Sequence, residues 1–319
     1  MFKASVPART APPGSTLGIT APGAPAKPER VQLGLAELSR RGYQVRMPLD
    51  PSLFYGRYEH LFSSDSRENR AQGLRALIAD AEVSAIIAVR GAYGSLEVLP
   101  LLDFDDLALQ RKLIVGSSDI TALLLQVVSR TGLAAIHGPT LSNEIADSAA
   151  DAGAGETTDA LLKLLAGSIG HLRLQGQKLR GDAARGPILA GNLTMLTTLV
   201  GTPLDVDYSG VILVIEEIGE APFRIHRSLT QLKLAGKLDS LAALCFGRFS
   251  RCTASHGPTV EDVLHDACNN LLRGTSYPII SGLEVGHYGK NMPLPLGCLA
   301  SVEEGLLTVL ESPFAPTTL

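Results

Sequence analysis

A serine-bearing turn between a strand and a helix is the part of this sequence best suited to chemistry. Leu113–Val115 is a short apolar run typical of a buried parallel strand, and Gly116–Asp119 (GSSD) follows it, ahead of a helix expected to reach about Arg130. A sharp strand–turn–helix lifts a hydroxyl to the carboxyl edge of a sheet and points a helix N-terminus at it. The segment therefore predicts a nucleophile elbow.

The same turn also has a simpler interpretation. Serine and aspartate are common N-caps, so Ser117 or Ser118 could do no more than begin the helix. The turn also lacks the last glycine of the usual G-x-S-x-G elbow. On this segment alone a cap is the favoured explanation, and other parts of the chain have to decide.

Ionisable residues follow other apolar strands. Val211–Ile215 is apolar throughout and ends in Glu216 and Glu217, whose side chains must leave opposite faces of the strand. His287 lies in a glycine-flanked loop after Ile279–Val285. Taken with the elbow serine, one carboxylate and one histidine are the parts of a serine nucleophile, its base and an orienting acid.

Each of these residues also has an ordinary alternative. Carboxylates at a strand end are usually solvated, and a loop histidine is usually a surface or hydrogen-bonded residue. The same holds for His137, which precedes Gly138-Pro139, and for His226 on a helix expected to be exposed.

Alternating strands and helices are expected to position the elbow. Strand Leu17–Thr20, helix Pro28–Arg41 and strand Tyr43–Met47 form a β-α-β unit, and the strand Ala85–Val89 ends in the tight loop Arg90–Gly94. Further on, short strands broken by glycine and proline predominate. The predicted class is α/β, with an N-terminal doubly wound, mainly parallel sheet domain and a C-terminal strand-rich mixed α/β domain. Ligands of such sheets bind at the carboxyl ends of the strands, where both loops lie.

Composition divides the chain into four parts. We expect a disordered lead-in over 1–16, a nucleophile-bearing α/β domain over 17–147, a linker with one helix over 148–171, and a domain with the glutamate and histidine over 172–319. The candidate site then lies in an interdomain cleft.

Charge and composition exclude several classes of protein. The net charge is −4 and the basic residues are scattered, which argues against nucleic acid and an anionic membrane. No apolar run is long enough to span a bilayer, and no secretory signal is present, so a cytoplasmic location is expected. The four cysteines have no zinc spacing and are expected to be free thiols, with no metal and no cofactor.

The chain resembles the LD-carboxypeptidase family of serine peptidases, which includes muramoyltetrapeptide carboxypeptidases and microcin C self-immunity peptidases. The resemblance covers roughly residues 17–310 and is specific because many segments match in order and spacing. Those segments are Gly18–Gly23 (GITAPG), Ala88–Ser95 (AVRGAYGS), Gly116–Thr121 (GSSDIT), His137–Pro139 (HGP), Ala190–Leu193 (AGNL), Glu216–Glu220 (EEIGE) with Arg224, Ile225 and Arg227 beyond it, and Gly286-His287.

The resemblance implies a role for each matching residue. It implies Ser118 as nucleophile, Glu216 as the triad carboxylate and His287 as the base. Backbone N–H groups of Ala92 and Asp119 would form the oxyanion hole. The substrate-binding candidates that it adds are Arg90, Gly91 and Tyr93.

Three positions depart from the family pattern. Ala92 replaces the second glycine of Arg-Gly-Gly-Tyr-Gly, which keeps the N–H although alanine resists positive φ. Ser117 replaces a residue that is often aromatic, and Glu217 replaces a frequent aspartate. None removes a catalytic group, so they bear on substrate preference.

The resemblance implies hydrolysis of the amide bond between an L-configured centre and a terminal D-amino acid, through an acyl-enzyme. The leading substrate is the cytoplasmic murein tetrapeptide, from which D-alanine would be released in cell-wall recycling by a homodimeric enzyme. One alternative is a microcin C-type immunity peptidase that cleaves an aminoacyl-nucleotide, which the absence of Trp disfavours modestly. The other is a non-catalytic small-molecule binding protein.

Overall fold

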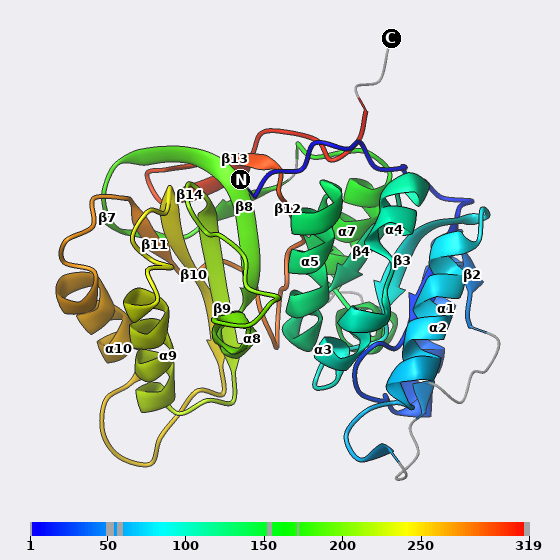
Figure 1. The fold of residues 1–319 in the computed structure, drawn as a ribbon, viewed down its shortest axis with the longest axis horizontal. Coiled ribbons are helices and arrows are strands. Elements are labelled where there is room, and N and C mark those ends of the chain that lie inside the picture. Colours follow the sequence, from blue (N-terminus) through cyan, green and yellow to red (C-terminus); the bar gives the residue numbers. More distant parts are fainter. Residues whose placement is uncertain (1, 49–53, 56–59, 152–154, 171, 316–319) are drawn as a thin grey trace.

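Two sheets lie side by side and are covered by helices (Figure 1). The computed structural model describes residues 2–48, 54–55, 60–151, 155–170 and 172–315. One sheet has six strands and the other eight, and the chain passes from the first to the second at about residue 172. The α/β class and the division into a mainly parallel sheet and a strand-rich sheet are confirmed.

The first sheet is parallel except at one edge, and its strand order is β12-β5-β4-β3-β1-β2. The order reverses between β1 and β3, so the loops after these strands diverge and leave a crevice at their carboxyl ends. The loop of the predicted oxyanion hole follows β3, and the elbow follows the adjacent β4. The strands are β1 (Thr16–Thr20), β2 (Gln44–Arg46), β3 (Val83–Ala88), β4 (Leu113–Gly116), β5 (Ala135–His137) and β12 (Leu294–Leu296).

The helices of this half alternate with its strands, as the sequence predicts. Ser66 caps α2 by accepting from Asn69 N, and Gly132 ends α5 with a left-handed φ of 69°. The helices are α1 (Pro28–Arg40), α2 (Arg67–Ala79), α3 (Ser95–Val98), α4 (Phe104–Gln110), α5 (Thr121–Thr131), α6 (Ala146–Ala150) and α7 (Gly155–Leu165).

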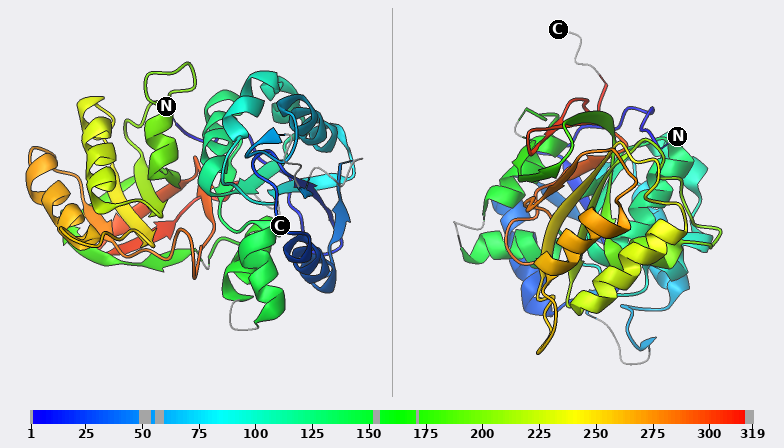
Figure 2. Two further views of the ribbon diagram at one scale, coloured as in Figure 1. Left: turned by 90° about the horizontal axis from the view of Figure 1, so that it is seen from below. Right: turned by 90° about the vertical axis from the view of Figure 1, so that its left-hand side faces the viewer.

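The second sheet has a parallel centre, β8-β9-β10-β11, flanked by antiparallel strands. Helices α9 and α10 pack against each other on one face of it (Figure 2). The strands are β6 (Arg173–Gln175), β7 (Gln177–Arg180), β8 (Ala183–Asn192), β9 (Ile212–Ile218), β10 (Ala243–Ser250), β11 (Ile279–Ser281), β13 (Leu299–Glu303) and β14 (Leu306–Val309). The helices are α8 (Leu193–Leu199), α9 (Pro222–Leu234) and α10 (Val260–Asp266).

Strand β12 joins the two halves. It comes from the C-terminal part of the chain but pairs antiparallel with β5, with Leu294 opposite His137 (Figure 1). The chain then turns into β13 of the other sheet, and Gly297 N donates to Ile188 O over 2.8 Å. The two sheets therefore share a backbone hydrogen-bonded seam, at which residues of both halves are held together.

The expectation that residues 1–16 are disordered is wrong for the described part of this segment. Phe2 and Ala11 are buried, and Ala4, Ala8 and Arg9 donate backbone hydrogen bonds to distant loops. The segment is low in regular structure because it lies extended across both halves, and its apolar side chains and backbone pairing fix it there.

No helix among the described residues has the length and apolar character needed to cross a bilayer. All four cysteines are buried free thiols, as predicted.

Candidate active site

The turn after β4 has the backbone of an elbow. Ser118 has φ 60°, in the left-handed region that a serine rarely adopts, and it begins a short 3₁₀ turn that leads into α5. The side chain of Ser117 stands at the N-cap position but makes no capping hydrogen bond. A serine that only caps a helix would accept a hydrogen bond from the first helical turn, and the cap would not require a left-handed φ at the next residue. The capping interpretation is therefore disfavoured.

The loop after β3 lies flush against this turn. A Cβ on Gly91 would come within 2.8 Å of Ser118 Cβ and within 2.9 Å of Asp119 N, so no side chain fits there. Gly91 is thus required for the close approach of two backbones. The neighbouring Ala92 has φ 72°, so this alanine adopts the left-handed conformation that favours the glycine usual at this position of the family. The N–H groups of Ala92 and Asp119 therefore lie on adjoining segments, as an oxyanion hole needs.

The Asp119 side chain ties the two loops together rather than facing a substrate. Its Oδ2 accepts from Ser95 N over 2.8 Å, and Ser95 Oγ donates to Asp119 O over 2.6 Å. Burial raises the pKa of Asp119, and its hydrogen bonds with Ser95 and the charge of Arg70 oppose that rise. The elbow is thereby fixed to the start of α3.

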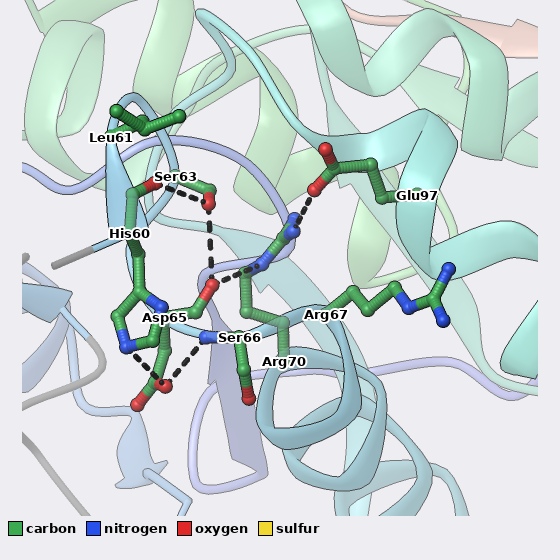
Figure 3. Close-up of a pocket in the computed structure, with 8 residues that line it drawn as sticks. All are labelled: His60, Leu61, Ser63, Asp65, Ser66, Arg67, Arg70 and Glu97. Carbon is green, nitrogen blue, oxygen red and sulfur yellow. Dashed lines mark hydrogen bonds and ion pairs between the residues drawn. The ribbon is translucent and has the colours of Figure 1, made fainter.

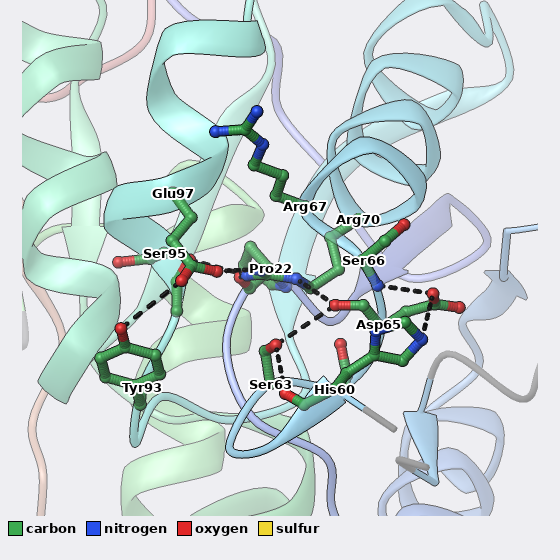
Figure 4. A network of polar contacts seen from close by, with 12 residues as sticks. Pro22, His60, Ser63, Asp65, Ser66, Arg67, Arg70, Tyr93, Ser95 and Glu97 are labelled. Carbon is green, nitrogen blue, oxygen red and sulfur yellow. Dashed lines mark hydrogen bonds and ion pairs between the residues drawn. The ribbon is translucent and has the colours of Figure 1, made fainter. Parts of the chain in front are cut away.

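Arg70 fixes the loop after β3 to the loop after β1 (Figure 4). Its guanidinium is fully buried and donates to Pro22 O, Gly94 O and Asp65 O, and it pairs with Glu97. One buried cation thus joins the loops after β1 and β3. Beside it lies a depression of about 260 Å³ (Figure 3), which none of the predicted catalytic residues lines. Its lining residues are His60, Leu61, Ser63, Asp65, Ser66, Arg67, Arg70 and Glu97.

Glu216 and His287 form a hydrogen-bonded pair from separate elements. Glu216, on β9, is fully buried, and its Oε2 lies 2.6 Å from His287 Nδ1. A Cβ on Gly286 would come within 3.0 Å of Glu216 Cβ, and one on Gly247 within 3.4 Å. Glycines on both sides therefore let the histidine loop and β10 close over the carboxylate.

This pair lies next to the elbow. Gly116 is opposite His137 in the β4–β5 ladder, and His137 Nε2 is 4.0 Å from Glu216 Oε1. Asn192, opposite Glu216 in the β8–β9 ladder, donates its backbone N–H to Thr121 Oγ1 at 3.2 Å. A Ser118–His287 hydrogen bond is not among those of the described residues, so this pairing stays a prediction.

The electrostatics of His287 suit a base. Burial alone would lower the pKa of His287, but the hydrogen bond and charge of Glu216 outweigh it, with Glu144 and Glu217 adding to the effect, so the pKa is raised. A Nδ1–H donated to Glu216 leaves Nε2 to accept a proton.

The backbone of the histidine loop is held at both ends. Asn291 Oδ1 accepts from Gly286 N at 3.0 Å, and Asn291 Nδ2 donates to the buried Glu144 at 3.3 Å. On the other side Ser250 Oγ donates to His287 O. The loop thus connects a turn of the first half to β10 of the second.

Glu217 is buried on the other face of β9, so the solvated interpretation of the two acids is wrong. Its Oε1 accepts from Asn192 Nδ2 and Ile218 N, both at 2.7 Å. Its Oε2 accepts from Thr194 N at 2.8 Å and Thr194 Oγ1 at 2.7 Å. Thr194 lies in the first turn of α8, so this acid closes a helix N-terminus and does not touch His287.

The substrate-binding candidates are placed differently from one another. Arg90 Nη1 donates to Pro25 O at 3.4 Å, whereas its buried Nε has no partner among the described residues. Tyr93 is 50% exposed and meets the Phe62 ring edge-on, with centroids 5.8 Å apart. Arg90 therefore keeps a donor available, and Tyr93 with Phe62 forms an exposed aromatic pair by the loop.

Comparison with known proteins assigns the family. The model of the LD-carboxypeptidase N-terminal domain matches residues 17–138, and that of the LD-carboxypeptidase C-terminal domain matches residues 185–302. The chain belongs to the LD-carboxypeptidase family. It is 32% identical to the murein tetrapeptide carboxypeptidase of Pseudomonas aeruginosa, over 77% of this chain and 80% of that protein.

Two solved structures have a fold similar to that of this chain. Muramoyltetrapeptide carboxypeptidase from Oxalobacter formigenes has a TM-score of 0.79 and 28% identity, covering 94% of this chain and 100% of its own. The microcin C7 self-immunity protein MccF has a TM-score of 0.86 over 98% of this chain and 100% of its own, at 22% identity, which is a likeness of fold. This LD-carboxypeptidase is therefore an enzyme, as predicted, and the alternative of a non-catalytic binding protein is set aside.

Sequence reasoning missed the residues that support this site. Arg70 lies on a polar helix face, and Asn291 and Glu144 have no motif of their own, so no local pattern marked them. His137 was noticed within His-Gly-Pro, but its complete burial was not expected.

Proposed function

We propose that this LD-carboxypeptidase releases C-terminal D-alanine from a cytoplasmic murein tetrapeptide during cell-wall recycling. The observation that carries the proposal is the 2.6 Å hydrogen bond between His287 Nδ1 and the buried Glu216. It lies at the positions that the family pattern selects for base and acid, beside an elbow with a strained serine. The name of the Pseudomonas aeruginosa relative supports the choice of substrate.

The proposed reaction is acyl transfer to Ser118. His287 Nε2 takes the hydroxyl proton as Ser118 Oγ attacks the carbonyl carbon, while Glu216 holds the imidazole and stabilises the imidazolium. The N–H groups of Ala92 and Asp119 receive the oxyanion, a contribution of roughly 2.7–4 kcal/mol per donor in a comparable enzyme. His287 then gives the proton to the departing amine of D-alanine, and water hydrolyses the acyl-enzyme by the same steps.

Recognition of the free C-terminus is assigned to Arg90. A carboxypeptidase must bind the carboxylate beside the scissile bond, and charge-assisted hydrogen bonds from arginine suit that group. The Nε of Arg90 has no partner among the described residues, and Gly91 places the start of its loop against the elbow. We further propose that the enzyme works as a homodimer.

The first test compares three peptides that differ only at the C-terminus. The enzyme should release alanine from a murein tetrapeptide ending in D-alanine and should not act on its L-alanine epimer or its D-alanine amide. The amide cannot satisfy donors arranged for a carboxylate, and the epimer exchanges methyl and carboxylate positions. Alanine release is measured by mass spectrometry. Comparable rates on all three peptides would indicate an amidase of broader specificity.

Neighbouring serines supply a matched control for the nucleophile. Ser118→Ala should abolish hydrolysis, whereas Ser117→Ala should retain it, because only Ser118 has the left-handed φ of the elbow, whereas Ser117 is buried. Equal losses in both variants, or loss in Ser117→Ala alone, would mean that the nucleophile is misassigned.

A second candidate function is cleavage of an aminoacyl-nucleotide, as the MccF likeness and one observation suggest. The exposed Phe62–Tyr93 pair offers aromatic surface on which a base could stack, although Trp is absent from the chain. An aminoacyl sulfamoyl nucleoside assayed beside the tetrapeptide separates the two. Faster turnover of the nucleoside would favour the immunity-type function.

A further inference from the structure

His137 is a buried histidine that the proposed triad does not use. It ends β5 at the seam between the two sheets, and its side chain is fully buried. Neither ring nitrogen has a hydrogen-bond partner among the described residues. Buried polar side chains nearly always have a partner, so this ring calls for a physical explanation.

One acceptor nearby is also unpaired. Glu216 Oε1 has no hydrogen-bond partner among the described residues, while Oε2 of the same carboxylate bonds to His287. His137 Nε2 lies 4.0 Å from Oε1. That distance is beyond a hydrogen bond, but a small rotation of either side chain or one bridging water would span it.

The charge state of His137 fits a donor rather than an ion pair. Burial lowers the pKa of His137 to about 4, although the charge of Glu216 opposes the shift and that of His287 adds to it. The ring is therefore neutral at neutral pH. A neutral imidazole carries a single N–H, which in the Nε2–H tautomer faces Glu216.

We propose that His137 is a positioning residue that donates its Nε2–H to Glu216 Oε1, directly or through one water. It thereby fixes the carboxylate whose Oε2 orients His287. This rests on the proposed function, because Glu216 matters to the reaction only as the acid of the triad.

The backbone around His137 makes this arrangement rigid. Gly116 lies opposite His137 in one ladder and Leu294 lies opposite it in the other, so the ring is held between the strand that leads to the elbow and the seam strand β12. A Cβ on Gly138 would lie 3.1 Å from Pro293 Cα, so the chain after His137 is also closely packed. Rotation of the Glu216 carboxylate is then opposed from one side by His137 and from the other by His287.

The test uses two substitutions at His137 in the full-length enzyme. His137→Phe keeps the ring volume but removes the donor, whereas His137→Gln keeps an N–H near the Nε2 position. We expect His137→Phe to lower kcat by about 10–100-fold, the scale seen when an outer hydrogen-bond partner of a functional ligand is lost, with KM changed little. His137→Gln should recover most of that loss. His226→Gln, at a surface histidine paired with Asp266, is the matched control and should leave kcat unchanged.

A measurement without substrate separates this inference from the proposed function. NMR titration of the His287 ring should give a raised pKa in the wild type and in His137→Gln, and a pKa closer to the ordinary value in His137→Phe. If the tetrapeptide is not cleaved but the His287 pKa responds in this way, the substrate assignment fails and the positioning role stands.

Three outcomes overturn the positioning role. One is an unchanged His287 pKa in folded His137→Phe. Another is equal loss of kcat in His137→Gln and His137→Phe, since packing alone would explain it. If His137→Phe does not fold, a folded His137→Gln with both low kcat and an ordinary His287 pKa also overturns it.

Discussion

Substitution of the two adjacent acids on β9 should have different effects, on catalysis for Glu216 and on stability for Glu217. Glu216→Gln replaces the acceptor of the His287 Nδ1–H by an amide, which can present its NH₂ group and favour the wrong tautomer of the base. By analogy with the same substitution in a serine protease triad, kcat should fall about 10⁴-fold. Glu217→Gln keeps the Glu216–His287 hydrogen bond and removes only a minor charge contribution to the pKa of His287, so kcat, measured per folded molecule, should stay within about tenfold of the wild type.

The effect on stability should run the other way. Four donor groups converge on the Glu217 carboxylate, two on each oxygen. A glutamine has one oxygen, so two donors lose their acceptor. Thr194 Oγ1 can rotate and accept from the new NH₂ group, which leaves the Thr194 backbone N–H unpaired at the start of α8. One buried orphan donor costs about 1–3 kcal/mol, and we expect that loss in the free energy of unfolding.

The assay pairs two measurements on each variant. Urea denaturation gives the free energy of unfolding, and steady-state release of alanine from the tetrapeptide gives kcat. The reasoning is refuted if Glu217→Gln has the larger effect on kcat, or if Glu216→Gln retains full turnover. Unchanged stability in Glu217→Gln would show that the four hydrogen bonds do not hold the helix start.

Two further predictions follow from the geometry. Because the pKa of His287 is raised, kcat/KM should rise with pH to a plateau, with a midpoint above about 6.5. The stability that the His287–Glu216 pair adds at lower pH should be lost as pH rises through the folded-state pKa of His287. A midpoint of kcat/KM at or below about 6.5 contradicts this prediction. Ala92→Gly should retain activity, because the backbone N–H is kept. It should raise the free energy of unfolding by up to about 1 kcal/mol, because relief of roughly 1–2 kcal/mol of backbone strain at φ 72° exceeds the added unfolded-state entropy of about 0.5–1 kcal/mol. A clear loss of stability in denaturant titrations would argue that Ala92 is unstrained.

Local patterns predicted the elements that carry the elbow. The alternation of short apolar runs with helical segments gave β1, β3, β4 and their helices within a residue or two, because buried parallel strands and amphipathic helices have distinct periods. Helix starts such as Ser66 at α2 and Asn192 at α8 are local in the same sense, since each needs only a side-chain acceptor at the N-cap.

Contacts between distant segments could not be predicted in this way. Strand β12 reads as a proline-interrupted segment of the second half, and only its pairing with β5 places it in the first sheet. The lead-in is polar and proline-rich in sequence, yet its few apolar side chains find buried positions on a surface built by both halves. Long-range pairing of this kind has no signature in the segment itself.

Short strands, tight glycine turns and their spacing are local properties of the chain, so they were enough to indicate the family and the residue types of the candidate triad before any contact was known. The resemblance implied that Glu216 is the acid beside the histidine, but the physical reason for the difference between the two acids lies in the folded chain. Glu216 and Glu217 are chemically identical neighbours, and their different surroundings come from the two faces of β9, one closed by the His287 loop and the seam, the other by the start of α8. The burial of His137 beside Glu216 arises in the same way, since it requires two sheets from opposite halves of the chain to meet at one strand end.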